Sequence, residues 1–583
     1  MKKYNIRQLA VAFFAVFSFS ACTDEFAEIN TDPNIVKDAE LDHLLTFAEK
    51  QLRDVGHMWF WDNHHYYMTW TQHSVPQGGN SDEFVTINNL IGQKSLLYKS
   101  LMPNLMEIRE QIDNMPDESK IKRERMRAIT YPILIYQAIK VTDMYGDIPY
   151  LEAGRGRYEQ LLNPKYDKQS DLYDIWISEL NTVIKTLTED ITDAEGNVVE
   201  QSVYGSKGKA EIIYSSDWAK WAKFANTLKL RLAIRLTHAD PTRAKTIAEE
   251  ALSNSAGIFE GPADEFRRLP KTDDRGPDNE MHYTTPHGAY EFMKFMCDTQ
   301  DPRTKNYFEP NGFTDEVVQK FESSATATLP DIIKNAPTEM HRRYIGLPVS
   351  PDKVDDDAYA QFFTPVKLDG DNSYRTASRL HYRYFHPAKR SGNGYYIYMY
   401  YSYGEMCFNI AELIERLGIN GDAEEWYNKG VRASLEMVDM LASAAQVEQH
   451  EDLTETEITD YLAMPQVAYT GDKDTKLEKI AIQQQINFFR DPFQSFVYSR
   501  RTGFPKKGSD LLPWEPFILE NGTKARLPRR ISLGDPGEFN RTNWEQAMSA
   551  QGFTPMTNNI LLLNTERMWI DENSPEFGHE TFD

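Results

Sequence analysis

Cysteine is nearly absent from this sequence, which has three in 583 residues: Cys22, Cys297 and Cys407. Cys22 lies at the end of an N-terminal apolar run, so only two cysteines remain for the folded chain. Two cysteines cannot form a disulfide framework or a cysteine-rich zinc site. We predict that Cys297 and Cys407 are buried free thiols, and a single bridge between them is the alternative.

Local catalytic signatures are also missing. The sequence has no HExxH, no GxSxG, no CxxC and no phosphate-binding loop. This is only weak evidence against an enzyme, because many glycosidases carry no local signature. The acid-rich loops 351–359 and 369–372 could hold calcium, but they lack EF-hand spacing and are more typical of solvated loops. His64, His65 and His73 lie among aromatic residues without acidic partners, which favours packing. We therefore predict no metal and no cofactor.

No apolar run is long enough to cross a membrane, which needs about 20 residues. The longest, Leu9 to Ala21, follows Lys2, Lys3 and Arg7 and ends at Cys22, as a secretory signal does. Residues 19–22, FSAC, resemble a bacterial lipobox with phenylalanine where leucine is usual. We predict that residues 1–21 are a lipoprotein signal peptide and that Cys22 is the acylated N-terminus. An ordinary signal peptide cut near Ala21 is the alternative.

Positive charge is scarce. The formal net charge is −24, and removal of the three positive charges in residues 1–21 makes it −27. Such a chain does not attract nucleic acid through its overall field. Its 40% hydrophobic and 12% aromatic residues are too many for a disordered protein. We predict a folded, acidic protein that binds no nucleic acid.

Helical periodicity dominates what is present. In 217–236, apolar residues recur at steps of three and four after Asp217, a typical N-cap. The stretch 123–147 predicts a long helix with a kink at Pro132 and an end at Gly146. Further helices are predicted over 40–58, 88–113, 169–187, 241–254, 404–417, 422–445 and 476–490. Their arrangement as four loose pairs resembles tetratricopeptide-like units, although no 34-residue repeat is visible.

The amino-acid composition changes between and after these helices. Residues 257–402 are rich in proline, glycine, aspartate and tyrosine, and 501–583 are also loop-rich. We predict a mainly α fold in which tetratricopeptide-like helix pairs form a scaffold with a large irregular, loop-rich lobe. The scaffold is expected over about 40–256 and 403–500, and the lobe over about 257–402. Residues 22–39 would be a lipidated tether, and 40–583 a single domain.

Aromatic residues are in surplus at two places. Tryptophan and tyrosine are concentrated in residues 58–73, MWFWDNHHYYMTWTQH, and tyrosine in residues 392–405, GNGYYIYMYYSYGE. Tyrosine and tryptophan combine an apolar ring with a hydroxyl or N–H group, so they suit surfaces that are partly exposed to water. The C–H faces of sugars stack on such rings. For any one ring, packing in the core is the more frequent role.

Seven segments, in order, resemble one family. They are FAEINTDPN after Cys22, VTDMYGDIPYLEA (141–153), WAKFANTLKLRLAIRL (221–236), DPRTKNYF (301–308), YGEMCFNIAELIERLG (403–418), VYSRRTGFP (497–505) and LPRRISLGDPGEFNRTNWEQA (527–547). They are similar to segments of the SusD/RagB outer-membrane lipoproteins of Bacteroidetes, in particular the SusD-like branch. Within them, Asn226 is expected to bond a neighbouring loop, and Arg500 and Arg501 to satisfy buried carbonyls or carboxylates.

The resemblance implies a function by binding. A SusD-like protein would capture a glycan at the cell surface and deliver it to a SusC-like TonB-dependent outer-membrane transporter. Capture of peptides, as in RagB-like members, is the alternative within the same class, and a secreted glycoside hydrolase is the rival from another. The acidic residues after Cys22 resemble the export tag that sends such lipoproteins to the outer face.

The resemblance also points to two places for the ligand: residues 59–80 and the loops of 275–290. We predict Trp59, Trp61, Gln77, Asn80, Tyr283 and Tyr290 as ligand-binding residues. None is fixed by a family motif, because binding loops differ most among relatives. The net negative charge argues against strongly anionic glycans, although a basic patch of Arg375, Arg379 and Arg383 could override it.

Overall fold

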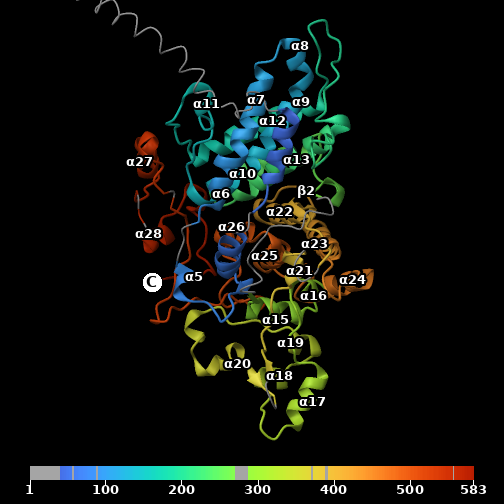
Figure 1. Ribbon diagram of the computed structural model, residues 1–583, viewed down its shortest axis with the longest axis vertical. Coiled ribbons are helices and arrows are strands. Elements are labelled where there is room, and N and C mark those ends of the chain that lie inside the picture. Colours follow the sequence, from blue (N-terminus) through green and yellow to red (C-terminus); the bar gives the residue numbers. More distant parts are fainter. Residues whose placement is uncertain are drawn as a thin grey trace, which may run out of the picture.

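The protein is described by a computed structural model that covers residues 40–54, 58–86, 90–269, 286–368, 372–387, 392–532, 534–555, 557 and 559–582. Figure 1 shows an elongated molecule. Helices of the N-terminal part gather at one end, the later long helices lie in the middle, and short elements of the lobe segment, residues 257–402, form the other end. The predicted signal peptide, tether and Cys22 lie outside the described residues.

Helices make up most of the described chain. The longer ones are α3 (Leu41–Gln51), α7 (Met102–Asp113), α10 (Thr130–Tyr145), α12 (Gln169–Thr188), α13 (Trp218–Arg235), α14 (Pro241–Ser253), α15 (Tyr290–Asp298), α17 (Asp315–Ser323), α22 (Tyr403–Leu417), α23 (Ala423–Ala445), α24 (Glu455–Ala463), α25 (Lys473–Asn487), α26 (Pro492–Thr502) and α27 (Arg541–Ala550). The shorter ones are α4 (Met68–Trp70), α5 (Asp82–Thr86), α6 (Gly92–Ser95), α8 (Asp117–Lys120), α9 (Glu124–Ala128), α11 (Gly156–Glu159), α16 (Thr304–Tyr307), α18 (Asp331–Lys334), α19 (Glu339–Arg343), α20 (Ala360–Phe363), α21 (Tyr382–Phe385) and α28 (Ile560–Thr565). The chain also forms two π-helical stretches, η1 (Met58–Tyr67) and η2 (Leu96–Leu101), and the 3₁₀ turn η9 (Phe488–Arg490).

Local chemistry explains several helix ends. The Asp217 side chain accepts hydrogen bonds from the backbone N–H groups of Ala219 and Lys220, as predicted for an N-cap of α13. Gly146 ends α10 with φ of +74°, which a residue without a side chain adopts at no steric cost. Pro132 lacks the N–H that would bond the carbonyl of Ala128, and the chain breaks at Ile129, between α9 and α10. The predicted kink is therefore three residues earlier than Pro132.

Neighbouring helices pack as pairs. α12 packs on α13, α13 on α14, and α22 on α23. The last pair is especially close, because a side chain at Gly430 of α23 would place a Cβ only 2.7 Å from the Phe408 ring of α22. The helix predicted over 40–58 ends at Gln51, and η1 begins at Met58. The proposed division into scaffold, lobe and tail stays a prediction.

The described chain contains three small antiparallel sheets of two strands each, and two of them join distant segments. β1 (Ser74–Val75) pairs with β3 (His287–Gly288), and β4 (Val366–Lys367) pairs with β5 (Ser373–Tyr374). β2 (Phe266–Arg268) pairs with β6 (Tyr398–Tyr401), with a register shift between Phe266 and Arg267. The β2–β6 pair closes the lobe segment near both of its ends.

Buried ion pairs connect helices that are far apart in the sequence. Arg231 of α13 binds both carboxylate oxygens of Glu405 of α22, at 2.8 and 2.6 Å. Arg235 of α13 donates to Asp143 of α10 at 3.0 Å. Arg501 of α26 binds both oxygens of Glu412 of α22, at 2.7 and 2.9 Å. The predicted role of Arg501 as a partner of a buried carboxylate is thus confirmed.

Three further predictions about buried groups are confirmed. The Asn226 amide nitrogen donates to the carbonyls of Ala251 and Gly257, both at 2.8 Å. Arg500 donates to the carbonyls of Arg529 and Asp143. Cys297 and Cys407 are buried and free, as predicted. Among the described residues, none of the helices combines the length and the apolar character of a membrane span.

We predict that Glu412→Gln lowers the free energy of unfolding by about 3 kcal/mol, because it leaves the buried Arg501 without its charge partner. Burial alone would raise the pKa of Glu412, but Arg501 and Arg416 hold it well below its usual range. The stabilisation from this carboxylate is therefore present above its unfolded pKa and is lost as the pH falls. Denaturant unfolding at neutral pH measures the effect.

Glu425→Gln is the matched control, since Glu425 pairs with Lys429 at 2.6 Å on the surface of α23 with both side chains exposed. Exposed pairs contribute about 0–1 kcal/mol. Equal stability of the two variants would contradict the structural role of Glu412.

Candidate pocket at the junction of the helices

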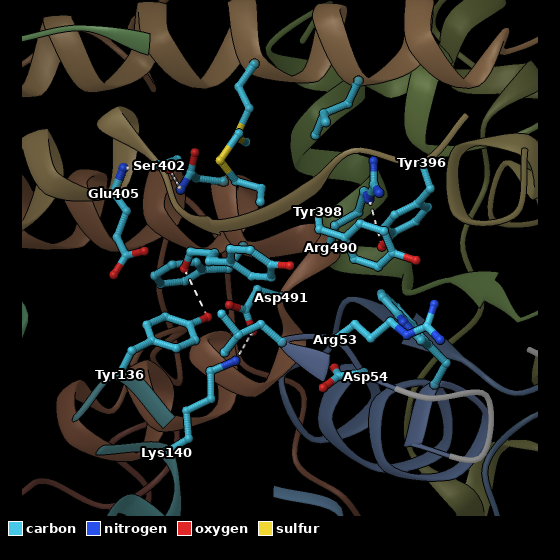
Figure 2. Close-up of a pocket in the computed structure, with 18 of the residues that line it drawn as sticks. Arg53, Asp54, Tyr136, Lys140, Tyr396, Tyr398, Ser402, Glu405, Arg490 and Asp491 are labelled. Carbon is cyan, nitrogen blue, oxygen red and sulfur yellow. Dashed lines mark hydrogen bonds and ion pairs between the residues drawn. The ribbon is translucent and has the colours of Figure 1, made fainter. Parts of the chain in front are cut away.

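A pocket of about 840 Å³, including its open mouth, lies where the N-terminal and later helices meet β6. Figure 2 shows side chains from these separate segments turned toward the same space. The lining residues are Leu52, Arg53, Asp54, Trp59, Leu96, Tyr136, Gln137, Lys140, Tyr384, Tyr396, Tyr398, Met399, Tyr400, Ser402, Glu405, Met437, Leu441, Asn487, Phe488, Arg490 and Asp491. Tyrosines and residues of both charges predominate, so the pocket combines ring faces with polar groups.

The tyrosine-rich run supplies one wall. Tyr396, Tyr398 and Tyr400 line the pocket at alternate positions, and Met399 and Ser402 contribute to the same lining. Tyr401, on the other side, packs its ring over the guanidinium of Arg231 at 4.0 Å. The Tyr396 and Tyr398 rings are 4.8 Å apart between centroids. The run thus divides between pocket lining and core packing.

Helix α10 supplies the opposite wall. Tyr136 and Lys140 lie four residues apart and therefore on one helix face. The Tyr136 hydroxyl donates to the carbonyl of Tyr400 at 3.2 Å, which connects the two walls. The Lys140 ammonium is 4.0 Å from Asp491. Burial alone would lower the pKa of Lys140, but the Asp491 carboxylate outweighs it and raises the pKa above its usual value.

Arginine 490 is held against rings rather than carboxylates. Its guanidinium lies 3.8 Å from the centroid of Tyr396 and 5.0 Å from that of Tyr384. It donates to the Ile397 carbonyl at 3.1 Å. A guanidinium over an aromatic face is a favourable contact that also keeps the side chain in place. Arg490 therefore presents a fixed positive group to the pocket.

The carboxylates of the pocket differ in their availability. Glu405 has both oxygens bound by Arg231. Asp54 accepts from the amides of Asn63 at 2.8 Å and Gln93 at 3.3 Å, and burial raises its pKa. Asp54 and Asp491 differ from Glu405 in that, within the described chain, no guanidinium binds them: Asp54 accepts from neutral amides, and Asp491 faces Lys140 at 4.0 Å.

Three buried polar atoms in the lining have no hydrogen-bond partner among the described residues. They are Nε of Arg53, a donor, Oδ1 of Asn487, an acceptor, and the hydroxyl of Tyr400, which can do either. Asn487 donates its amide to the Ser402 hydroxyl at 3.3 Å, which fixes the orientation of the side chain. Since buried polar groups are normally bonded, these atoms suit a hydroxyl-bearing ligand.

Of the predicted ligand-binding residues that the structure describes, Trp59 is the one that lines this pocket. It is 4% exposed, and its ring lies 5.9 Å from Phe385. Trp61 is half-buried, with its ring 5.1 Å from His65. Tyr283 lies outside the described residues.

The other three predicted residues lie elsewhere. Gln77 is exposed. Asn80 is buried and donates to the Val349 carbonyl at 2.8 Å, so its amide nitrogen already has a structural partner. Tyr290 is half-buried, and its ring stands edge-on to Phe362 at 5.4 Å. Their binding roles stay predictions.

One feature of the α10 sequence indicates the pocket, although no predicted ligand residue came from it. Lys140 and Gln137 interrupt the otherwise apolar run of α10, and such interruptions mark polar groups that need buried partners. The remaining lining comes from segments too far apart in the chain for any local pattern to join.

The three histidines near η1 have packing roles, as predicted. His64, His65 and His73 are buried, and burial lowers their pKa values to about 3, 4 and 3. The His65 ring stacks on Phe84 at 4.6 Å. Within the described ranges, no three histidine, cysteine, aspartate or glutamate side chains gather as a metal site.

Two family models match the chain. Residues 53–340 match the model described as SusD and RagB outer-membrane lipoprotein, and residues 357–530 match the one described as starch-binding, associating with the outer membrane. The chain belongs to the SusD family. The predicted membership is confirmed, and with it the outer membrane as the location of this lipoprotein family. No protein with a curated function matches the chain.

Solved structures of SusD homologues share the fold. A SusD homologue from Bacteroides fragilis is 18% identical with a TM-score of 0.64, covering 91% of this chain and 100% of its own. A chitin-binding SusD homologue from Flavobacterium johnsoniae is 19% identical with a TM-score of 0.61, covering 92% and 99%. A further chitin-binding protein is 20% identical with a TM-score of 0.63, covering 92% and 100%. The predicted fold class, mainly α and SusD-like, is confirmed.

We predict that Asp62→Asn changes how stability depends on pH. Burial, with the neighbouring Asp54, raises the pKa of Asp62 to about 7. Between pH 4 and 7 the unfolded chain releases this proton while the folded protein keeps it, so wild-type stability falls as the pH rises. The asparagine variant should escape this loss and gain about 4 kcal/mol relative to wild type between those limits. Unfolding midpoints across the range measure it.

Asp355→Asn removes the same charge from an exposed loop and should follow wild type. A constant difference between Asp62→Asn and wild type at every pH would rule out the protonated buried state.

Proposed function

We propose that this protein captures a glycan at the outer face of the outer membrane and delivers it to a SusC-like TonB-dependent transporter, without catalysis. The pocket lined by Trp59, Tyr136, Tyr396 and Tyr398 carries the proposal, since it joins ring faces to unpartnered polar atoms. Sugars need both: their C–H faces stack on rings and their hydroxyls need donors and acceptors. Family membership supports the location and the class of function.

Chitin fragments are the first ligands to test, because two proteins of similar fold are described as chitin-binding. Peptide capture is the second candidate. The observation that favours it is the presence of Lys140 and Arg490 beside Asp54 and Asp491 in one pocket. Groups of both charges can pair with the ammonium and carboxylate ends of a peptide, and they can also form hydrogen bonds with sugar hydroxyls.

The partner proposal rests on the family alone. A lipid anchor at Cys22 would hold the protein beside an outer-membrane barrel. Several acyl chains give durable attachment, at about 0.8 kcal/mol for each buried methylene. The surface that contacts the barrel has no assignment.

We predict that Tyr398→Ala weakens binding of the best hit on a glycan and peptide array about tenfold, because a stacked ring contributes on the order of 1–2 kcal/mol. Isothermal titration measures the change. Trp61→Ala and Tyr290→Ala are the comparison variants: they remove rings from the predicted loops and leave the pocket lining intact.

Wild-type affinity in Tyr398→Ala, with weaker binding in Trp61→Ala or Tyr290→Ala, would move the site to the loops. Release of reducing ends from the bound glycan by the pure protein would instead favour a hydrolase.

We predict that Cys22→Ala abolishes membrane attachment. Wild-type protein should partition with the outer membrane, and mass spectrometry of its N-terminus should show acyl chains on Cys22. The variant should remain in the soluble fraction or keep its signal peptide. An unmodified N-terminus at another residue would disprove the anchor.

The same detergent extract tests the partner. Wild-type protein should bring a large TonB-dependent barrel with it. Its consistent absence would count against delivery to such a transporter.

A further inference from the structure

A second hollow, open to solvent and of about 1100 Å³, lies in the lobe segment. We call it the arginine groove. Its lining is Glu309, Pro310, Asn311, Gly312, Pro365, Ser373, Tyr374, Arg375, Ala377, Ser378 and Arg379. It shares no residue with the pocket at the helix junction.

The backbone that carries the two arginines is fixed by bonds to its neighbours. The Asn311 amide donates to the carbonyls of Thr376 and Arg342, both at 2.7 Å. The backbone N–H of Ser378 donates to the Ile345 carbonyl at 2.7 Å. Thr376 and Ser378 are each 1% exposed. Arg375 and Arg379 therefore lie on either side of buried, bonded positions, and the groove has a rigid floor.

The described residues place no carboxylate in an ion pair with either arginine. Among the described residues, the Arg379 guanidinium has no hydrogen-bond or ion-pair partner, and Arg375 makes one bond, to the Phe363 carbonyl at 3.2 Å. The next arginine along the chain differs: Arg383 pairs with Glu448 at 3.2 Å and does not line the groove. The basic patch indicated by the sequence is thus reduced to Arg375 and Arg379.

The positive charges of Arg375 and Arg379 act on the buried side chain of His287. The pKa of His287 is lowered to about 3, first by burial and then by Arg379 and Arg375. The carboxylate in the groove lining is Glu309, which accepts from the backbone N–H of Tyr382 at 3.4 Å. With two guanidinium groups and one carboxylate, the groove is positive on a strongly negative protein.

An aromatic ring completes the lining. Tyr374 is half-buried and packs against Phe313 and Phe321, with centroids 5.7 Å apart in each pair. Gly312 leaves room for it, since a Cβ there would lie 3.1 Å from the ring. The ring is thus held at the edge of the groove beside Arg375.

We infer that the arginine groove binds an acidic oligosaccharide, of the uronate type. Guanidinium groups match the planar carboxylates of such sugars with paired hydrogen bonds. Sugar hydroxyls can donate to Glu309, and a ring face can pack on Tyr374. Because the groove is open to solvent, the ligand need not be fully enclosed. The inference rests on the proposed glycan capture and specifies a ligand class and a second site for it.

The test uses a short oligogalacturonate and its methyl-esterified form, titrated into the full-length mature protein at low ionic strength. Wild type should bind the acidic form, and Arg375→Gln/Arg379→Gln should bind it at least about tenfold more weakly. The esterified form should bind weakly to both. Added salt should weaken binding of the acidic form, because charge pairs at an open surface are screened.

Arg383→Gln is the control, since it removes a nearby arginine that pairs with Glu448 outside the groove, and the variant should bind as wild type does. Equal affinity of wild type and the double variant, or absence of oligogalacturonate binding by wild type, would overturn the inference. If a neutral glycan still binds in the pocket, the proposed function survives that result. If the acidic oligomer binds and no array glycan does, the groove stands and the pocket assignment fails.

Discussion

Buried guanidinium–carboxylate pairs between distant helices are the constraint on which this structure depends. Arg231–Glu405, Arg235–Asp143 and Arg501–Glu412 each join segments at least 89 residues apart. Removing such charges from water is costly, and the cost is recovered only when every donor and acceptor is correctly placed. The pairs therefore favour one arrangement of α10, α13, α22 and α26 over other helix packings of similar apolar area.

The pocket is a product of the same arrangement. Glu405 belongs both to the ion pair with Arg231 and to the pocket lining, and Tyr136 packs at the same junction. Because Glu405 is already paired, the polarity offered to a ligand comes from Asp54, Lys140, Arg490 and Asp491. The helices that hold the fold together thus also determine which charges remain for binding.

The sequence predicted local features better than the pocket. The Asp217 cap and the end of α10 at Gly146 follow from residue chemistry within one helical turn. The π-helical form of 58–67 was missed, because its aromatic residues suit either a helix or a strand. The pocket brings together segments from Leu52 to Asp491, and its local signs in the sequence are the tyrosine run around β6 and the polar residues Gln137 and Lys140 within α10. Of the predicted ligand residues that the structure describes, Trp59 is the one that lines the pocket.

The pairing of β2 with β6 has a consequence for how such proteins diverge. The lobe segment leaves the helices near Phe266 and returns beside it at Tyr401. A segment whose two ends lie side by side can change in length at little cost. The reason is that the entropic cost of closing a loop rises only slowly with the number of residues in it. Insertions, deletions and exchanges need not disturb the helices where they avoid residues such as Arg303 and Tyr307, which bond to α23, α24 and α25. Evolution can therefore replace the recognition surface of this molecule while inheriting its framework unchanged.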